Sequence, residues 1–298
     1  MADATALSNL SAELGKIATS ASASAVRVHA RRGPPASGLV WRPGLIVTAD
    51  EAVEVDEGIE VRLPDGTTVP ATLAGRDPST DIALLRCAGA TNAVSAATGV
   101  AIAIGQLALA VGQGRHGTLA GLAMVSTVSG PWQSQRGGRI DGFVGLDMRF
   151  DRRLEGAGLF AADGALIGML AAGPHHSSLA IPTATIERVA SQLEANGKIA
   201  RGYLGLGLQP VVVPPAAGAS DPRRGVMVVS VDAAGPGQTA GVLQGDILLT
   251  WNSEPVGSVH GVFRRLGSEA VGQGIDLGLL RAGQHTATRL IVGERPTT

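Results

Sequence analysis

Short apolar segments separated by turn residues dominate the chain between residues 21 and 182. Segment 25–30 (AVRVHA) alternates apolar and polar positions, as a half-buried strand does. Further segments of this kind are 37–41, 45–48, 60–63, 69–73, 81–87, 106–111 and 121–128. The sequence Pro-Asp-Gly at 64–66 is typical of a hairpin turn between two of them. Because no long helical pattern interrupts this region, the pattern predicts a mainly β fold of the barrel or sandwich kind.

Two stretches have helical periodicity instead. Residues 4–20 place leucine and isoleucine three or four positions apart, which predicts a short amphipathic helix that docks on the rest of the chain. Residues 183–196 place Ile186, Val189 and Leu193 on one face, and Gly197 fits the position just after a helix C-terminus. We expect this second helix to close a first domain.

A second unit follows a short linker at 198–202. We therefore divide the chain into a first domain at 1–200 and a second at 201–298. Proline and glycine cluster at 210–225, which predicts an exposed loop within the second domain.

Residues 151–169 (DRRLEGAGLFAADGALIGM) form the most informative hairpin pattern of the chain. A glycine-containing turn at 155–158 leads into an apolar strand. A second turn at Asp163 and Gly164 then leads into another apolar strand at 165–170.

Composition narrows the function classes. The net charge is −1, and no basic stripe indicates a nucleic-acid partner. Cys87 is the one cysteine, so no intramolecular disulfide is possible. The most apolar segment, 99–112, is too short to span a bilayer. The first thirty residues contain no continuous apolar segment, so we expect no secretory signal and a cytoplasmic location.

Several long motifs resemble the HtrA/Deg family of trypsin-like serine proteases. The segments that carry the resemblance are SGLVW…GLIVTADEAV, LPDGTTVPATLAGRDPSTDIALLR, LAIP, GKIARGYLGLGLQPV and AGPGQTAGVLQGDILLTWNSEPV, in the family's order. The resemblance covers nearly the whole chain. It implies a trypsin-like double β-barrel followed by a C-terminal PDZ domain, an α+β module of the circularly permuted bacterial type.

The resemblance also implies where a catalytic triad would lie. Asp81 matches the family's aspartate, whereas Glu51 stands at the histidine position and Glu155 at the serine position. Arg153 stands at a glycine position that helps to line the oxyanion hole. With the histidine, serine and oxyanion-glycine positions of this site replaced, we expect no catalytic residue and predict that the chain is not an enzyme.

Glu51, Asp81 and Glu155 converge in one pocket if the family fold is kept. Like charges at close range raise the pKa of at least one carboxyl group or recruit a cation. We expect an internal salt-bridge cluster in which Arg152 and Arg153 neutralise Glu155. The alternative is a site for a hard cation such as calcium or magnesium.

The second domain resembles a PDZ module at two places. Tyr203, Leu204, Gly205 and Leu206 resemble the carboxylate-binding loop, in which a glycine lets consecutive N–H groups point at one anion. The strand at 206–211 then offers an open edge to an extended peptide. In the family topology the helix at 258–266 forms the other groove wall. Residues predicted to bind the peptide from that helix or near the carboxylate are Arg201, Val259, Val262, Phe263 and Leu266.

These observations predict a catalytically inactive HtrA-like pseudoprotease. It would act as a protein-binding adaptor whose PDZ groove recognises C-termini or exposed apolar segments. Its partner would be a protein or peptide ligand, and it would also pair with an active HtrA homologue or with itself, without a cofactor or a metal. One alternative is an active serine endopeptidase or hydrolase with a non-standard site, for which Ser126, Ser129 or Ser134 would supply the nucleophile. The other alternative is a cation-binding protein that uses the acidic cleft.

Overall fold

The computed structural model describes residues 2–95, 102–134, 136–173, 177–213 and 223–296. The chain divides into two compact units, Met1–Ile199 and Ala200–Thr298. Each unit has its own hydrophobic core and is described by itself below.

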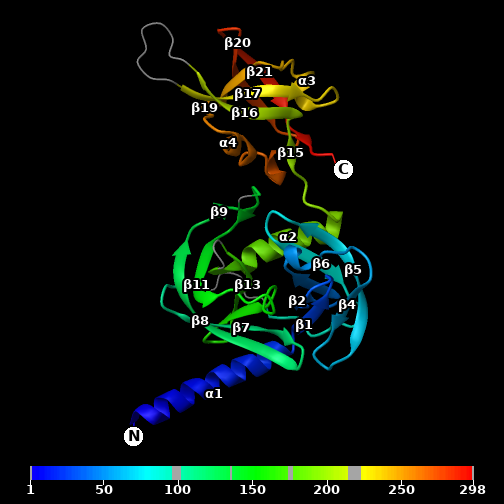
Figure 1. The fold of residues 1–298 in the computed structure, drawn as a ribbon, viewed down its shortest axis with the longest axis vertical. Coiled ribbons are helices and arrows are strands. Elements are labelled where there is room, and N and C mark those ends of the chain that lie inside the picture. The colour runs from blue at the N-terminus through cyan, green and yellow to red at the C-terminus, as the bar shows by residue number, and fades with distance from the viewer. Residues whose placement is uncertain (1, 96–101, 135, 174–176, 214–222, 297–298) are drawn as a thin grey trace. The chain divides into compact units, whose positions relative to one another are not determined.

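The first half of unit one is a closed six-stranded antiparallel barrel with strand order β1-β2-β3-β6-β5-β4 (Figure 1). Burial alternates along β4, where Ile59 and Val61 face the barrel core while Glu60 and Arg62 face outward. Apolar residues at every second position therefore determine which face of β4 is buried, whereas β3 is buried along its whole length. The strands are β1 (Ala25–His29), β2 (Ala36–Arg42), β3 (Leu45–Thr48), β4 (Ile59–Arg62), β5 (Thr68–Asp77) and β6 (Ile82–Arg86), and a 3-10 turn, η1, spans Asp50–Ala52.

The second half of unit one is another closed six-stranded barrel with strand order β11-β14-β13-β12-β7-β8. It contains the predicted hairpin, whose strands β12 and β13 pair with Gly158 opposite Met169. The mainly β double barrel predicted from the sequence is confirmed. The strands are β7 (Leu107–Gly114), β8 (Gly117–Ser129), β11 (Phe143–Arg149), β12 (Gly158–Ala161), β13 (Leu166–Ala172) and β14 (Ser177–Pro182), with a small hairpin of β9 (Trp132–Gln133) and β10 (Arg139–Ile140).

Both predicted helices of unit one are confirmed. In α1 (Ala2–Ser22), Leu14 and Ile17 pack against the barrel core, whereas Leu7 and Leu10 are exposed. Helix α2 (Thr183–Asn196) buries its apolar face and ends at Gly197, whose φ of 72° is left-handed. The Gly197 N–H donates to the carbonyl of Leu193, as expected of a glycine at this position.

Unit two is built on one sheet, in which β16 is an edge strand and is followed by β17, β18, β20 and β21. Helix α4 lies beside β16. The elements are β15 (Gly202–Tyr203), β16 (Leu206–Val213), β17 (Arg223–Val231), α3 (Pro236–Thr239), β18 (Ile247–Trp251), β19 (Glu254–Pro255), α4 (Val259–Phe263), η3 (Ser268–Ala270), β20 (Gly274–Arg281), β21 (Gln284–Ile291) and β22 (Gly293–Glu294).

Two predictions for unit two need correction. Residues 210–213 and 223–225 of the predicted loop belong to β16 and β17, which pair with each other, while 214–222 lie outside the described residues. Prolines had suggested a loop, but Pro210 is tolerated because β16 is an edge strand. The predicted helix at 258–266 is shorter, because Ser258 caps its N-terminus and the helix ends at Phe263.

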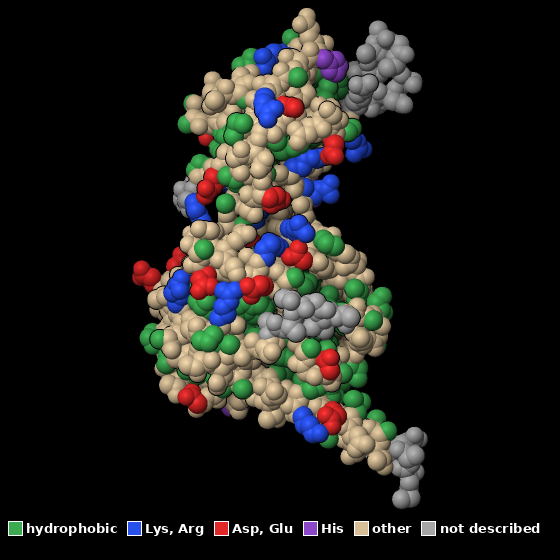
Figure 2. Space-filling model, turned by 180° about the vertical axis from the view of Figure 1, so that it is seen from behind, with side chains coloured by type: hydrophobic (Ala, Val, Ile, Leu, Met, Phe, Trp, Pro, Cys, Tyr) green, Lys and Arg blue, Asp and Glu red, His purple; other side chains and the backbone are tan. Residues whose placement is uncertain are grey.

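The surface fits the near-zero net charge. On the face shown in Figure 2, acidic and basic side chains are interspersed over unit one. Cys87 is buried, as a structural cysteine is expected to be. No helix in the described ranges combines the length and the apolar character that crossing a bilayer requires.

Candidate functional site

The side chain of Glu155 is buried at the point where the two barrels of unit one meet. It is 2% exposed, and its Oε2 accepts a hydrogen bond of 2.5 Å from Nη1 of Arg31. Both side chains of this ion pair are at most 3% exposed. The carboxylate therefore satisfies its charge inside the protein, where an unpaired charge would be costly.

The backbone around Glu155 is equally fixed. The Glu155 carbonyl accepts the N–H of Ser37 at 2.9 Å, and the Gly156 N–H donates to Leu170 at 2.9 Å. Gly156 has a φ of 79°, and a Cβ there would lie 2.3 Å from the Ser37 carbonyl oxygen. Because a side chain fits neither the conformation nor the space, glycine is required at this position.

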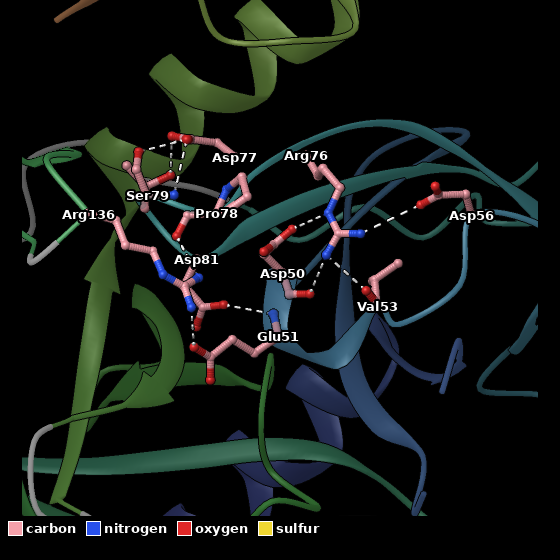
Figure 3. Close-up of polar contacts among 11 residues, drawn as sticks. Asp50, Glu51, Val53, Asp56, Arg76, Asp77, Pro78, Ser79, Asp81 and Arg136 are labelled. Carbon is pink, nitrogen blue, oxygen red and sulfur yellow. Dashed lines mark hydrogen bonds and ion pairs between the residues drawn. The ribbon is translucent and has the colours of Figure 1, made fainter. Parts of the chain in front are cut away.

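Asp81 and Glu51 meet on the first barrel. The Asp81 Oδ1 accepts the backbone N–H of Glu51 at 3.0 Å, which ties the turn before β6 to η1 (Figure 3). Asp81 is half-buried and has a φ of 56°, in the left-handed region that few non-glycine residues adopt. The Glu51 side chain is exposed and lies 3.6 Å from the guanidinium of Arg136.

Burial raises the pKa of Asp81 to about 7. The N–H of Glu51 acts in the opposite direction, while the negative charges of Glu51, Glu155 and Asp50 add to the increase. Glu51 and Glu155, the two carboxylates predicted to share this pocket, therefore lie close enough to raise the pKa of Asp81. An acid that titrates near neutral pH is able to donate and accept protons in one cycle.

Sequence reasoning missed the buried carboxylate next to Glu51. Asp50 is 3% exposed and accepts a 2.5 Å hydrogen bond from Nε of Arg76. The same guanidinium donates to the carbonyl of Val53 at 2.9 Å and so fixes the end of η1 (Figure 3). A basic residue just before the DPSTD motif was the available signal, because a buried acid needs such a partner.

The predicted neutralisation of Glu155 by Arg152 and Arg153 is wrong. Arg153 is exposed and pairs with Asp151 at 2.6 Å. Arg152 contributes its carbonyl oxygen, 3.3 Å from Nη2 of Arg31. Arg31 supplies the counter-charge, because a chain segment far away in sequence packs against this loop.

The three serines named as alternative nucleophiles are either exposed or hydrogen-bonded to another part of the chain. Ser126 and Ser129 are exposed on β8, and the Ser134 hydroxyl donates to the carbonyl of Ser79 at 2.6 Å.

Within the described ranges, no three His, Cys, Asp or Glu side chains are arranged to hold a metal ion. With Asp50, Glu51 and Glu155 each facing an arginine, the arrangement argues against the cation-binding alternative.

The predicted carboxylate-binding loop of unit two requires glycine at position 205. Gly205 has a φ of 68°, and a Cβ there would lie 2.8 Å from Cα of Gly235. The carbonyls of Leu204 and Gly205 accept the N–H groups of Gly237 and Asp232 at 2.7 and 2.8 Å. In the part of the chain that the structure describes, the N–H groups of Leu204 and Gly205 donate to no hydrogen bond.

The other predicted peptide-binding residues have different environments. Phe263 on α4 is 53% exposed, whereas Val262 and Leu266 are buried in the core of unit two, so the prediction that these two side chains face a ligand is wrong. Leu206 and Val259 pack against that core and are partly buried. The Tyr203 hydroxyl donates to Asp232 at 2.6 Å, and the Arg201 carbonyl accepts the N–H of Arg295 at 2.8 Å.

Comparison with known proteins identifies two domains. Residues 36–169 match the family described as "Trypsin-like peptidase domain", and residues 202–292 match "PDZ domain". A "Probable periplasmic serine endoprotease DegP-like" of Rhizobium meliloti is 28% identical over 288 residues, covering 90% of this chain and 56% of that protein. A protein of the same name from Halomonas elongata is 29% identical over 278 residues, covering 89% and 57%. The chain thus spans about half the length of the curated relatives it matches.

Solved structures agree in fold. A serine endoprotease from Yersinia pestis matches with a TM-score of 0.73 and 26% identity, covering 95% of this chain and 98% of that one. A variant of the HtrA-type protease AlgW with a tripeptide matches with a TM-score of 0.72 and 25% identity, covering 95% and 97%.

Two expectations are contradicted by these names. The expectation that the chain is not an enzyme is contradicted because the relatives are called serine endoproteases. The expectation of a cytoplasmic location is contradicted because the curated relatives are called periplasmic.

The raised pKa of Asp81 predicts a specific dependence of stability on pH. Folded Asp81 keeps its proton up to about pH 7, whereas an unfolded aspartic acid releases it near pH ~4. The folded state therefore binds more protons in this window, so Asp81 makes stability fall as pH rises through it. Relative to Asp81→Asn, we expect the free energy of unfolding of the wild type to fall by at most about 1.4 kcal/mol per pH unit. Urea unfolding of both proteins between pH 4 and 8 measures this, and parallel pH curves would contradict the assignment.

Proposed function

Because the chain belongs to the HtrA/DegP-like family, with a trypsin-like peptidase domain followed by a PDZ domain, we propose that it binds extended protein or peptide segments through its PDZ domain. The observation that carries this proposal is the pair of N–H groups of Leu204 and Gly205, which donate to no hydrogen bond among the described residues and lie next to the edge strand β16. A peptide with a free, apolar C-terminal residue is the ligand that this arrangement fits best.

The edge of β16 supplies the main-chain part of the site. β16 pairs with β17 on one side, and its other side ends the sheet. Because α4 lies beside β16, a peptide strand added there would run between the two elements. The exposed ring of Phe263 on α4 supplies apolar surface for a ligand side chain.

The loop before β16 supplies the site for the terminal carboxylate. The left-handed conformation of Gly205 leaves the N–H groups of Leu204 and Gly205 available in succession. Consecutive backbone N–H groups of this kind form an anion-binding concavity. The solved structure of the AlgW variant with a tripeptide supports the proposal that this fold takes a short peptide.

The peptide-binding proposal predicts selectivity for a free C-terminus. Fluorescence anisotropy of the full chain with labelled peptides ending in Val or Leu should show saturable binding. Amidation of the C-terminus should weaken binding at least about tenfold, because charge-assisted hydrogen bonds to N–H groups are lost. Phe263→Ala should weaken it by a similar factor, whereas Ile291→Ala, which removes an equally exposed side chain (56% versus 53%), should not. Equal affinity for free and amidated peptides would contradict the carboxylate site.

A second function is favoured by the relatives named serine endoproteases. We propose that unit one hydrolyses peptide bonds with carboxylates in place of a serine. The supporting feature is the meeting of Asp81, whose pKa is near neutral, with the exposed Glu51. Paired carboxylates that differ in protonation act as acid and base in other hydrolases.

The proposed chemistry uses water as the nucleophile. The Glu51 carboxylate accepts a proton from water as the water oxygen bonds to the peptide carbonyl carbon. Asp81 gives its proton to the leaving nitrogen as the C–N bond breaks. Transfer of the proton from Glu51 back to Asp81 restores the site, so the sum is the addition of one water to one peptide bond.

Hydrolysis predicts measurable cleavage of unfolded casein by the purified full chain. Glu51→Gln and Asp81→Asn should each lower the rate by about 10²–10⁴-fold, the usual contribution of a general acid or base. Glu57→Gln removes an exposed carboxylate of the same region and should leave the rate unchanged. The rate should fall above pH about 7, where Asp81 loses its proton.

Two results would contradict the carboxylate chemistry. One is the absence of cleavage, and the other is inhibition by a serine-reactive fluorophosphonate. Neither result affects the peptide-binding proposal, which concerns a different unit.

For the location of the protein we propose the periplasm, the compartment named for the curated relatives.

A further inference from the structure

Three arginines gather beside the junction of β1, β4 and the β7–β8 hairpin. Arg27 lies on the outer face of β1, and Arg62 on β4 is its cross-strand partner. Arg115 lies in the turn that joins β7 to β8. Nη1 of Arg27 donates to the carbonyl of Gly114 at 3.2 Å, so the first barrel is joined to the residue next to Arg115. β1 also contacts β7, as their neighbouring positions in Figure 1 show.

This placement is electrostatically unfavourable without a counter-ion. Like charges that lie directly opposite each other on paired strands destabilise a sheet. Burial lowers the pKa of Arg27, and the positive charges of Arg62 and Arg115 lower it further. An arginine still remains charged at neutral pH. The protein therefore keeps three positive charges close together.

The three arginines lack partners that other arginines of unit one have. Arg31 and Arg76 each form an ion pair with a buried carboxylate. Among the residues that the structure describes, Arg27, Arg62 and Arg115 form no ion pair. Nε of Arg27 is buried and has no hydrogen-bond partner in that part of the chain. A buried N–H without a partner is destabilising unless a ligand accepts its hydrogen bond.

Other charged or titratable groups around the cluster leave its excess positive charge in place. His29 follows Arg27 on the same face, and its pKa is lowered by burial and by Arg27, so it is neutral at pH 7.5. Glu60 is the cross-strand partner of His29 and is exposed. His116 is exposed beside Arg115. Three arginines and one glutamate leave a net charge of about +2.

We propose that Arg27, Arg62 and Arg115 form a binding site for a phosphoryl dianion. A phosphate group carries between about −1.5 and −2 at pH 7, which matches the excess charge of the cluster. The planar guanidinium presents paired N–H donors that fit phosphate oxygens two at a time. Arg62 and Arg115 are exposed, so a ligand can reach their guanidinium groups, and a phosphate oxygen would supply the acceptor that Nε of Arg27 lacks.

A single carboxylate fits this cluster less well. It carries one negative charge and two oxygens, so it balances half of the excess and cannot engage three guanidinium groups in pairs. The phosphoryl group has two sources, free inorganic phosphate and a phosphorylated side chain. Both present the same charged oxygens to the arginines.

Isothermal titration of the full chain with inorganic phosphate tests the site directly. The experiment uses a chloride buffer at pH 7.5 and constant ionic strength. One molecule of phosphate should bind per chain. The double variant Arg62→Gln/Arg115→Gln should raise the Kd at least about tenfold, which corresponds to about 1.4 kcal/mol. Both residues are exposed, so the variant should fold: its circular dichroism should match that of the wild type, and its melting temperature in chloride should be at least as high, because repulsion between like charges is relieved.

The matched control is Arg149→Gln/Arg289→Gln, which removes two exposed arginines elsewhere and changes the net charge equally. It should bind phosphate as the wild type does. The proposal is overturned if the wild type does not bind phosphate, if the control loses binding to the same degree, or if succinate binds as tightly as phosphate.

Titration with O-phosphoserine distinguishes a phosphorylated side chain from free inorganic phosphate as the source of the phosphoryl group. Tighter binding than inorganic phosphate supports a phosphorylated side chain, and weaker binding supports free phosphate.

Discussion

The arrangement of unit one depends on the buried ion pair between Arg31 and Glu155. Arg31 follows β1 of the first barrel, and Glu155 precedes β12 of the second barrel. Neither charge reaches solvent, so each is tolerated because the other is present. The pair holds the loop at 151–157 in place, where Gly156 packs against Ser37 and leaves no room for a side chain. Gly156 also lies against Thr48 and Ala49, the residues that directly precede Asp50 and Glu51.

Local patterns predicted the elements of unit one well. Helix α2 ends at Gly197 as predicted because both the apolar spacing and the capping glycine are encoded within a few residues. The ion pair was not predictable in this way, since Arg31 and Glu155 are separated by 124 positions. Local reasoning chose Arg152 and Arg153 because they are neighbours in sequence. The folded chain instead brings the partner of Glu155 from the first barrel.

In unit two as well, local sequence patterns predicted backbone features but not the contacts between distant segments. Gly205 was identified from sequence because a tight turn before an edge strand requires it, and the structure gives it a left-handed φ. Val262 and Leu266 were predicted to face the peptide groove, and this prediction was wrong because both are buried in the core. Apolar spacing places residues on one face of a helix, but it does not say whether that face meets the sheet or a ligand. In this unit those two side chains complete the core, and Phe263 is left exposed.

The most direct test of this account is a double-mutant cycle on the Arg31–Glu155 pair, measured by urea unfolding at pH 7. Arg31→Met and Glu155→Leu should each lower the free energy of unfolding by about 3–5 kcal/mol, because each leaves an unpaired buried charge. The double variant removes both charges, so its loss should be clearly smaller than the sum of the two single losses. Two small losses below about 1 kcal/mol that add without coupling would contradict the central role of the pair.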